Sequence, residues 1–278
     1  MMSLRCGFLL LFSLGLSSAC LAQSATALPA AAAPEEVTFQ SGVITLHGFI
    51  YKPEGDGPFP AVLWNHGSEK KPGWLPELGV LFTSKGYVFF IPHRRGHGRS
   101  PGEYVMDQLQ TENRKNGLEA RSIKLVELMD VHLADQTAAL AFLKSLAYVE
   151  SKRIAVAGCS FGGIQTLLAA GAHLGIRAAI DFAGAAQSWR ESPELRQRMF
   201  RAARDADVPL LLIQAENDYD LAPSQELDKE LQRLGKPHKT IIYPPFGATP
   251  QEGHSLCVRN WQTWSSEVFS FLGSTMTQ

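Results

Sequence analysis

The sequence predicts an α/β fold with a mostly parallel central sheet and helices on both faces. Short apolar runs that fit buried strands alternate along the chain with segments of helical spacing, the pattern of strands joined by helical crossovers. The strand expected at 154–157 runs through a turn of small residues straight into a helix at 164–170. With 278 residues, 45% of them apolar, the chain is long enough to build one large core.

Alternation of apolar and polar residues, together with short apolar runs, predicts where the strands of this sheet lie. Segments 37–40 and 43–51 alternate enough to form a strand pair that turns at Ser41-Gly42. The later strands are mainly continuous apolar runs, as expected where both faces of a sheet are covered. These strands are expected at 61–64, 87–91, 154–157, 178–182, 210–213 and 239–243.

Helical spacing between the strands predicts the covering helices. Leu78, Leu81 and Phe82 fall on one face of a helix that Gly86 ends, and Gly235 is the C-cap of a later helix. The other helices are expected near 139–146, 164–170, 192–204, 227–234 and 261–271. Residues 101–130 fit the alternation of strands and helices poorly. We expect this segment to be a partly helical excursion over the top of the sheet, and a possible cap over a site.

The first 22 residues have the layout of a secretory signal peptide. Arg5 precedes an apolar run at 8–12, and small residues follow up to Ala22, while the apolar stretch is short for a transmembrane span. Cys20 also permits a lipoprotein anchor, but serine stands three residues before it, where leucine is expected. We therefore expect cleavage after Ala22, a linker at 23–34, a folded domain at 35–273 and an extracytoplasmic location, secreted or, in a Gram-negative source, periplasmic.

Composition narrows the classes of partner and cofactor. The formal net charge of −1 offers no electrostatic footprint for nucleic acid or for an anionic membrane surface. No C-x-x-C pair and no H-E-x-x-H spacing is present, so we expect neither a metal nor a cofactor. We also expect no stable membrane insertion once the signal peptide is removed, and the oligomeric state stays open.

The run Gly158-Cys159-Ser160-Phe161-Gly162-Gly163 carries the main functional signal. Gly-x-Ser-x-Gly between a buried strand and a helix is typical of a nucleophile elbow, in which the serine takes a strained backbone conformation and exposes its hydroxyl. The helix that follows directs its N-terminal amides at the place where an oxyanion would form. A glycine-rich turn with a surface serine is the alternative, and the strand–turn–helix context disfavours it.

A serine nucleophile needs a histidine base and a carboxylate that holds the base. Of the histidines after Ser160, His173 and His238 fit surface positions, while His254 lies in a loop after the last strand and follows Gly253. We therefore expect His254 to be the base. The acid should follow the strand at 210–213, where the residues themselves do not choose among three candidates, Glu216, Asp218 and Asp220.

These motifs resemble those of the dienelactone hydrolase branch of the α/β-hydrolase superfamily. The resemblance rests on the elbow, on Asn217-Asp218-x-x-Leu221-x-Pro223 and on Gly253-His254, and it extends over about residues 36 to 273. The chain is also similar to the catalytic domain of prolyl-oligopeptidase-type peptidases. The resemblance implies an α/β-hydrolase fold with Asp218 as the acid, although Ala215 replaces a glycine of the family's acid segment and an extra residue precedes Pro223.

The same resemblance implies the oxyanion hole and the reaction. The Phe161 amide and an amide after Trp64, that of Ser68 or its neighbour, would hold the oxyanion, with His66 as a hydrogen-bonded brace. Dienelactone hydrolases proper have a cysteine as the nucleophile, so Ser160 favours a general esterase that cleaves small-molecule esters through an acyl-enzyme. The alternatives are an exopeptidase or amidase of the same fold, or a catalytically silent hydrolase-fold binding protein.

Two further expectations concern the surroundings of Ser160. We expect the excursion to form a partly apolar cover that favours small to medium acyl esters, through Met106, Leu109, Leu125, Leu128 and Met129. We also expect Cys159 to be a buried, inert side chain rather than the nucleophile, and its pairing with Cys257 to be less favoured than two free thiols.

Overall fold

The computed structural model describes Met1 and residues 33–276 of the chain. The expected signal peptide at 1–22 and nearly all of the linker at 23–34 lie outside the described residues. The folded part begins at β1, which starts at Glu35, and the last helix ends at Thr275.

The centre of the fold is an eight-stranded sheet with the strand order β1-β2-β4-β3-β5-β6-β7-β8. Strands β1, β2 and β4 pair antiparallel, while every pairing from β4 through β3 to β8 is parallel. This arrangement confirms the predicted mostly parallel sheet. The strands are β1 (Glu35–Ser41), β2 (Ile44–Tyr51), β3 (Phe59–Asn65), β4 (Val88–His93), β5 (Val149–Cys159), β6 (Ala178–Phe182), β7 (Leu210–Ala215) and β8 (His238–Tyr243).

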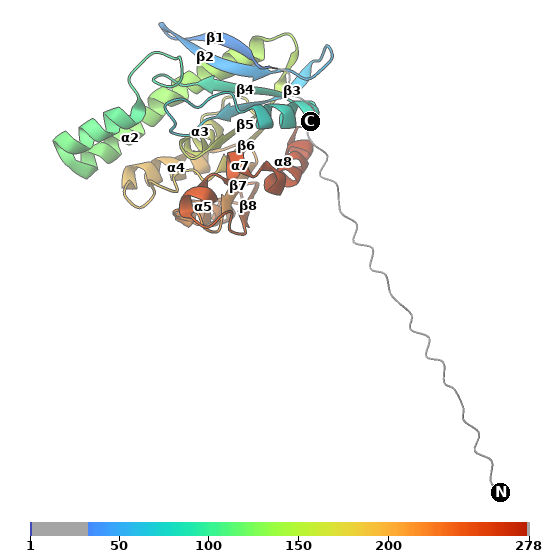
Figure 1. Cartoon of the computed structure of the whole chain (residues 1–278). Helices are drawn as coiled ribbons and strands as arrows, with labels where there is room; N and C mark the ends of the chain where they lie inside the picture. The colour runs from blue at the N-terminus through green and yellow to red at the C-terminus, as the bar shows by residue number, and fades with distance from the viewer. Residues whose placement is uncertain (2–32, 277–278) are drawn as a thin grey trace.

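Helices cover both faces of the sheet, as Figure 1 shows, and each face has its own apolar cluster. One cluster contains side chains of α2, α3, α4 and α5, and the other contains side chains of α1, α7 and α8. None of the helices in the described part of the chain is long and apolar enough to span a membrane. The helices are α1 (Pro76–Ser84), α2 (Val105–Ser145), α3 (Phe161–Ala170), α4 (Pro193–Asp205), α5 (Ala222–Arg233), α6 (Pro250–His254), α7 (Leu256–Arg259) and α8 (Trp261–Thr275).

Most of the segment expected to be an excursion at 101–130 is the first part of the long helix α2, which begins at Val105. This helix runs on to Ser145 with one kink at Gly117, where φ is 86° and ψ is −177°. The predicted apolar cover is wrong, because these side chains belong to the core on the α2 face. Leu109, Leu125, Leu128 and Met129 are buried there, and Met106 packs against the same cluster.

The parallel strands bring three loops to one edge of the sheet. Strands β3, β5 and β7 all end at this edge, because parallel strands point their carboxyl ends the same way. The segments that follow them begin with His66, Ser160 and Glu216 respectively. The fold therefore brings together the three regions in which the sequence places the oxyanion loop, the nucleophile and the acid.

Candidate active site

The turn between β5 and α3 has the geometry of a nucleophile elbow. Ser160 has φ 59° and ψ −117°, a strained backbone conformation for a residue with a side chain, and its amide donates to the Phe182 carbonyl at 2.9 Å. Glycine is required on either side, because a Cβ at Gly162 would lie 1.9 Å from the Asn65 carbonyl oxygen and one at Gly158 would lie 2.4 Å from the Gly162 carbonyl oxygen. The sequence therefore forces Ser160 to the tip of the turn.

The side chains of His254 and Asp218, the expected base and acid, lie in direct contact. His254 Nδ1 lies 2.8 Å from Asp218 Oδ1, and the Asp218 side chain is fully buried. The carboxylate also accepts hydrogen bonds from the Tyr219 amide at 2.6 Å and from Gln214 Nε2 at 3.0 Å. These donors hold Asp218 in one orientation, so that it fixes the proton of His254 on Nδ1 and leaves Nε2 as the basic nitrogen.

The other two carboxylates of the acid loop point elsewhere. Asp220 pairs with Arg190, with a distance of 2.9 Å between Nε and Oδ2, and it also accepts from the Ala222 amide at 3.0 Å. Glu216 is exposed to solvent. The geometry therefore supports Asp218 among the three candidates that the residues left open.

Two polar residues, Gln214 and Asn217, have roles in holding Asp218 and the loop before His254 that the sequence did not predict. Gln214, buried in β7, receives a hydrogen bond from Ser224 Oγ at 2.7 Å and gives one to Asp218. Asn217 joins the two loops, because its Nδ2 donates to the carbonyls of Phe246 and Thr249 and its Oδ1 accepts from the Phe246 amide. A glutamine inside an otherwise apolar strand was the one signal in the sequence that could have identified the first of them.

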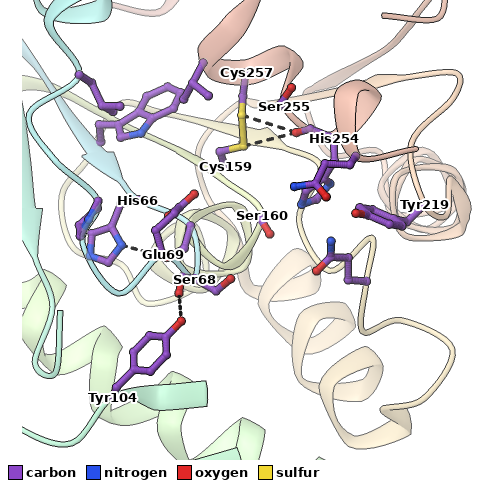
Figure 2. Close-up of a pocket in the computed structure, with 17 residues that line it drawn as sticks. His66, Ser68, Glu69, Tyr104, Cys159, Ser160, Tyr219, His254, Ser255 and Cys257 are labelled. Atoms are coloured by element: carbon purple, nitrogen blue, oxygen red, sulfur yellow. Dashed lines mark hydrogen bonds between the residues drawn. A yellow bond between two sulfur atoms is a disulfide. The ribbon is translucent and has the colours of Figure 1, made fainter. Parts of the chain in front are cut away.

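Ser160 and His254, the expected nucleophile and base, face the same cavity, as Figure 2 shows. His254 Nε2 is buried and has no hydrogen-bond partner, and no hydrogen bond joins it to Ser160 Oγ. In unliganded serine hydrolases this contact is often long and tightens when substrate binds. The cavity measures about 450 Å³ and is lined by Trp64, His66, Gly67, Ser68, Glu69, Pro72, Leu75, Tyr104, Cys159, Ser160, Gln187, Tyr219, Gln251, His254, Ser255, Cys257 and Val258.

The loop after β3 supplies the second side of the expected oxyanion hole. Ser68 lines the cavity, and its carbonyl accepts a hydrogen bond from the Tyr104 hydroxyl at 2.5 Å. Phe161 is the first residue of α3, so its amide has no acceptor within the helix. Both amides that the sequence assigned to the oxyanion therefore belong to segments that border the cavity.

The buried side chain of Arg94 holds the loop after β3, which begins at His66 and contains Ser68. Arg94 donates to the carbonyl oxygens of His66 at 2.8 Å and of Gly67 at 2.7 Å. Burial, and next the positive charge of Arg94, lower the pKa of His66 well below its usual value. The neutral ring places its Nδ1 2.9 Å from the Gly67 carbonyl, and its Nε2 accepts from the Arg94 amide. This is the bracing role that the sequence predicts for His66.

The two cysteines of the folded domain form a disulfide, so the expectation of two free thiols is wrong. Cys159 and Cys257 are bonded, with their Cα atoms 6.2 Å apart. The fold brings them together because Cys159 precedes the nucleophile and Cys257 follows the base by three residues. The carbonyl oxygen of His254 lies 3.9 Å and 3.8 Å from the two sulfur atoms. A thiolate nucleophile at Cys159 is not available while this bond is intact.

We expect loss of this disulfide to lower the free energy of unfolding by about 2 to 4 kcal/mol, because the bond closes a long loop in the unfolded chain. The two cysteines are 98 residues apart in sequence. Urea unfolding of Cys257→Ser beside the wild type, each with and without reductant, measures the effect. Reductant should not change the free energy of unfolding of the variant, and it should lower that of the wild type to about the value of the variant. Equal stability of oxidised wild type and variant would contradict the prediction.

A buried carboxyl group lies beneath the elbow. Burial raises the pKa of Asp181 to about 7, and the hydrogen bond from the Gly184 amide, 2.8 Å long, opposes the shift. Helix α3 packs closely on this group, since a Cβ at Gly163 would lie 2.1 Å from Asp181 Oδ1. The carboxyl therefore takes up a proton on folding at mildly acidic pH.

This carboxyl should make the folded state less stable as pH rises from about 4 to about 7. Between the ordinary pKa of 3.8 and the folded value near 7, the folded state binds more protons than the unfolded state, so stability falls by up to about 1.4 kcal/mol per pH unit. Asp181→Asn carries no titratable group and keeps the acceptor for Gly184. The variant should therefore gain stability relative to wild type as pH rises through this range in urea unfolding, and a constant difference would refute the assignment.

Within the described residues, no group of three or more His, Cys, Asp or Glu side chains is arranged to hold a metal ion. The candidate site brings together a serine, a histidine and a carboxylate beside backbone amides. By fold and by site, the chain is an α/β-hydrolase with serine in the nucleophile position.

The comparison with known families gives the family. Residues 75–256, well over half of the chain, match the dienelactone hydrolase family. This match includes the positions of Ser160, Asp218 and His254. The chain belongs to the dienelactone hydrolase family, as its motifs predicted.

The chain is also similar to a curated protein and to solved structures. A polyketide transferase from a Penicillium species is 30% identical over 211 residues, which cover 72% of this chain and 64% of the relative. Acylaminoacyl peptidase from Pyrococcus horikoshii has the same fold, with a TM-score of 0.67 and 21% identity over 88% of this chain and 42% of the peptidase. An esterase from Pyrococcus furiosus gives a TM-score of 0.61 and 18% identity over 87% of this chain and 90% of the esterase. The chain thus spans less than two thirds of the transferase and of the peptidase.

Proposed function

We propose that the protein is a serine hydrolase that cleaves carboxylic esters through an acyl-enzyme. The observation that carries the proposal is the 2.8 Å contact between His254 and a buried Asp218, at a cavity that Ser160 also lines. An extracytoplasmic location is part of the proposal, and the disulfide beside Ser160 supports it, because disulfides persist in oxidising compartments.

The proposed mechanism follows from the positions of these groups. Ser160 Oγ attacks the ester carbonyl while His254 Nε2 takes its proton and then gives it to the departing alkoxide. The amides of Phe161 and Ser68 would stabilise the oxyanion of the tetrahedral intermediate. Asp218 stabilises the imidazolium that forms on His254. Water, activated by the same Nε2, then hydrolyses the acyl-enzyme and regenerates Ser160.

A substrate panel together with covalent labelling tests this proposal. We expect the purified protein to hydrolyse acyl esters faster than aminoacyl amides, and a fluorophosphonate to label Ser160, as located by peptide mass spectrometry. Faster cleavage of the amides would favour an exopeptidase or amidase. Absence of labelling on a folded protein would instead indicate a hydrolase-fold binding protein.

Acyl transfer to an acceptor other than water is a second candidate function. The observation that favours it is the 30% identity to a protein named as a polyketide transferase. Both reactions share the acyl-enzyme, so they differ only in the nucleophile of the second step. Adding alcohols or amines to an ester assay and measuring the ratio of transfer product to free acid separates the two.

A further inference from the structure

The cavity at Ser160 is lined by both polar and apolar residues. Hydroxyl, amide and carboxylate groups come from Ser68, Glu69, Tyr104, Gln187, Tyr219 and Gln251. The apolar side of the cavity is formed by Trp64, Leu75, Val258 and the disulfide between Cys159 and Cys257. All members of the apolar side belong to, or pack against, the core cluster of α1, α7 and α8.

A second cavity, of about 270 Å³, adjoins the apolar side. It shares two lining residues, Leu75 and Val258, with the cavity at Ser160. Beyond this junction its lining consists of Pro76, Glu77, Leu78 and Arg259. The apolar lining beside Ser160 therefore extends through the two shared residues to Pro76 and Leu78, while Glu77 and Arg259 add two charged side chains. We call this second cavity the α1–α7 groove.

The backbone holds both junction residues in place. Leu75 has φ 47° and ψ 63°, a left-handed conformation that a residue with a Cβ adopts at an energetic cost, and it is the N-cap residue of α1. Val258 follows Cys257 directly, so the disulfide fixes the short helix that carries it to the end of β5. The junction is therefore formed before any substrate binds, which lowers the entropic cost of binding there.

We propose that the α1–α7 groove binds the apolar chain of an ester substrate whose carbonyl lies at Ser160, so that the enzyme prefers medium-length aliphatic chains over acetyl groups. This inference rests on the proposed ester hydrolysis. Burial of a methylene group favours binding about fourfold when the burial is complete. The groove is open to solvent, so we expect a smaller gain for each methylene and a total preference of about tenfold for octanoyl over acetyl esters.

Chain-length series measured as kcat/KM test the groove. p-Nitrophenyl acetate and octanoate vary the acyl chain, and methyl and octyl acetate vary the alcohol, so the two series identify which chain occupies the groove. Val258→Glu, which puts a charge at the junction, should reduce the octanoyl preference about tenfold, measured as the ratio of kcat/KM for the octanoate to kcat/KM for the acetate. The matched control is Val43→Glu, because Val43 is fully exposed in the turn between β1 and β2.

A pair of variants at Leu75 separates loss of the groove from loss of folding. Leu75→Gly and Leu75→Ala both remove the side chain, but only glycine adopts the left-handed backbone without strain. Both variants should lose the octanoyl preference, while the glycine variant should melt at a higher temperature than the alanine variant. If the two variants lose the octanoyl preference equally although their melting temperatures differ, the missing side chain, and not a loss of stability, is the cause.

The outcomes distinguish this inference from the proposed function. A folded wild type that hydrolyses none of these esters would overturn the proposed function. Hydrolysis of short and long chains at equal kcat/KM, or an octanoyl preference that survives both Val258→Glu and Leu75→Gly, would overturn the α1–α7 groove alone.

Discussion

Replacement of Ser160 by alanine should reduce kcat for ester hydrolysis about 10⁶-fold, to the level that binding and oxyanion stabilisation alone provide. Ser160 is the only residue of the elbow whose strained backbone lifts its side chain into the cavity, with φ 59° and ψ −117°. Removal of its hydroxyl leaves His254 with no nucleophile to deprotonate. Burst kinetics with a p-nitrophenyl ester measure the effect, and the variant should show neither a burst nor fluorophosphonate labelling.

The control for this prediction is another serine that lines the same cavity. Ser255 follows the base directly, and its Oγ donates to the Glu252 carbonyl at 2.7 Å, away from the proposed chemistry. Ser255→Ala should keep most of the turnover and label normally. A Ser160→Ala variant that still forms an acyl-enzyme would refute the proposed mechanism, whatever the behaviour of Ser255→Ala.

Replacement of Asp218 by asparagine should reduce kcat about 10⁴-fold, with the fold intact. Oδ1 accepts from His254 and from the Tyr219 amide, while Oδ2 accepts from Gln214. If the NH₂ group of the asparagine takes the place of Oδ1, it faces the Tyr219 amide and forces the proton of His254 onto Nε2. If it takes the place of Oδ2, it faces the NH₂ group of Gln214. The variant also lacks the charge that stabilises the imidazolium.

The neighbouring carboxylates are the matched controls for Asp218. Asp220→Asn weakens an ion pair with Arg190, whose side chain is 81% exposed, and Glu216→Gln changes only an exposed group. The carboxylate that contacts His254 is that of Asp218, so both variants should keep most of the turnover. Steady-state kinetics of the three variants decide the assignment, and a severe Asp220→Asn beside a mild Asp218→Asn would move the acid to Asp220.

The sequence by itself determined the fold class and the chemistry-bearing motifs. Apolar runs of strand length, with helical spacing between them, are local features, so they predicted the order of strands and helices without knowledge of their packing. The glycines around Ser160 were equally informative, because the turn they form allows no side chain at either position. His254 was predicted because the chain order of such triads places the histidine after the acid, and the other histidine there, His238, fits a surface position.

Apart from the family resemblance, only the tertiary structure distinguished among residues whose local sequence is alike. Glu216, Asp218 and Asp220 have the same chemistry within one loop, and the structure separates them through contacts with His254 and Arg190, which lie 36 and 30 residues away. The prediction that the first part of α2 covers the site was wrong for a similar reason. The apolar side chains of this helix are spaced among charged residues, and they pack against parts of the core that are distant in sequence. The disulfide was missed because Cys159 and Cys257 are 98 residues apart, and their distance in space depends on where the loop of His254 folds back over the sheet.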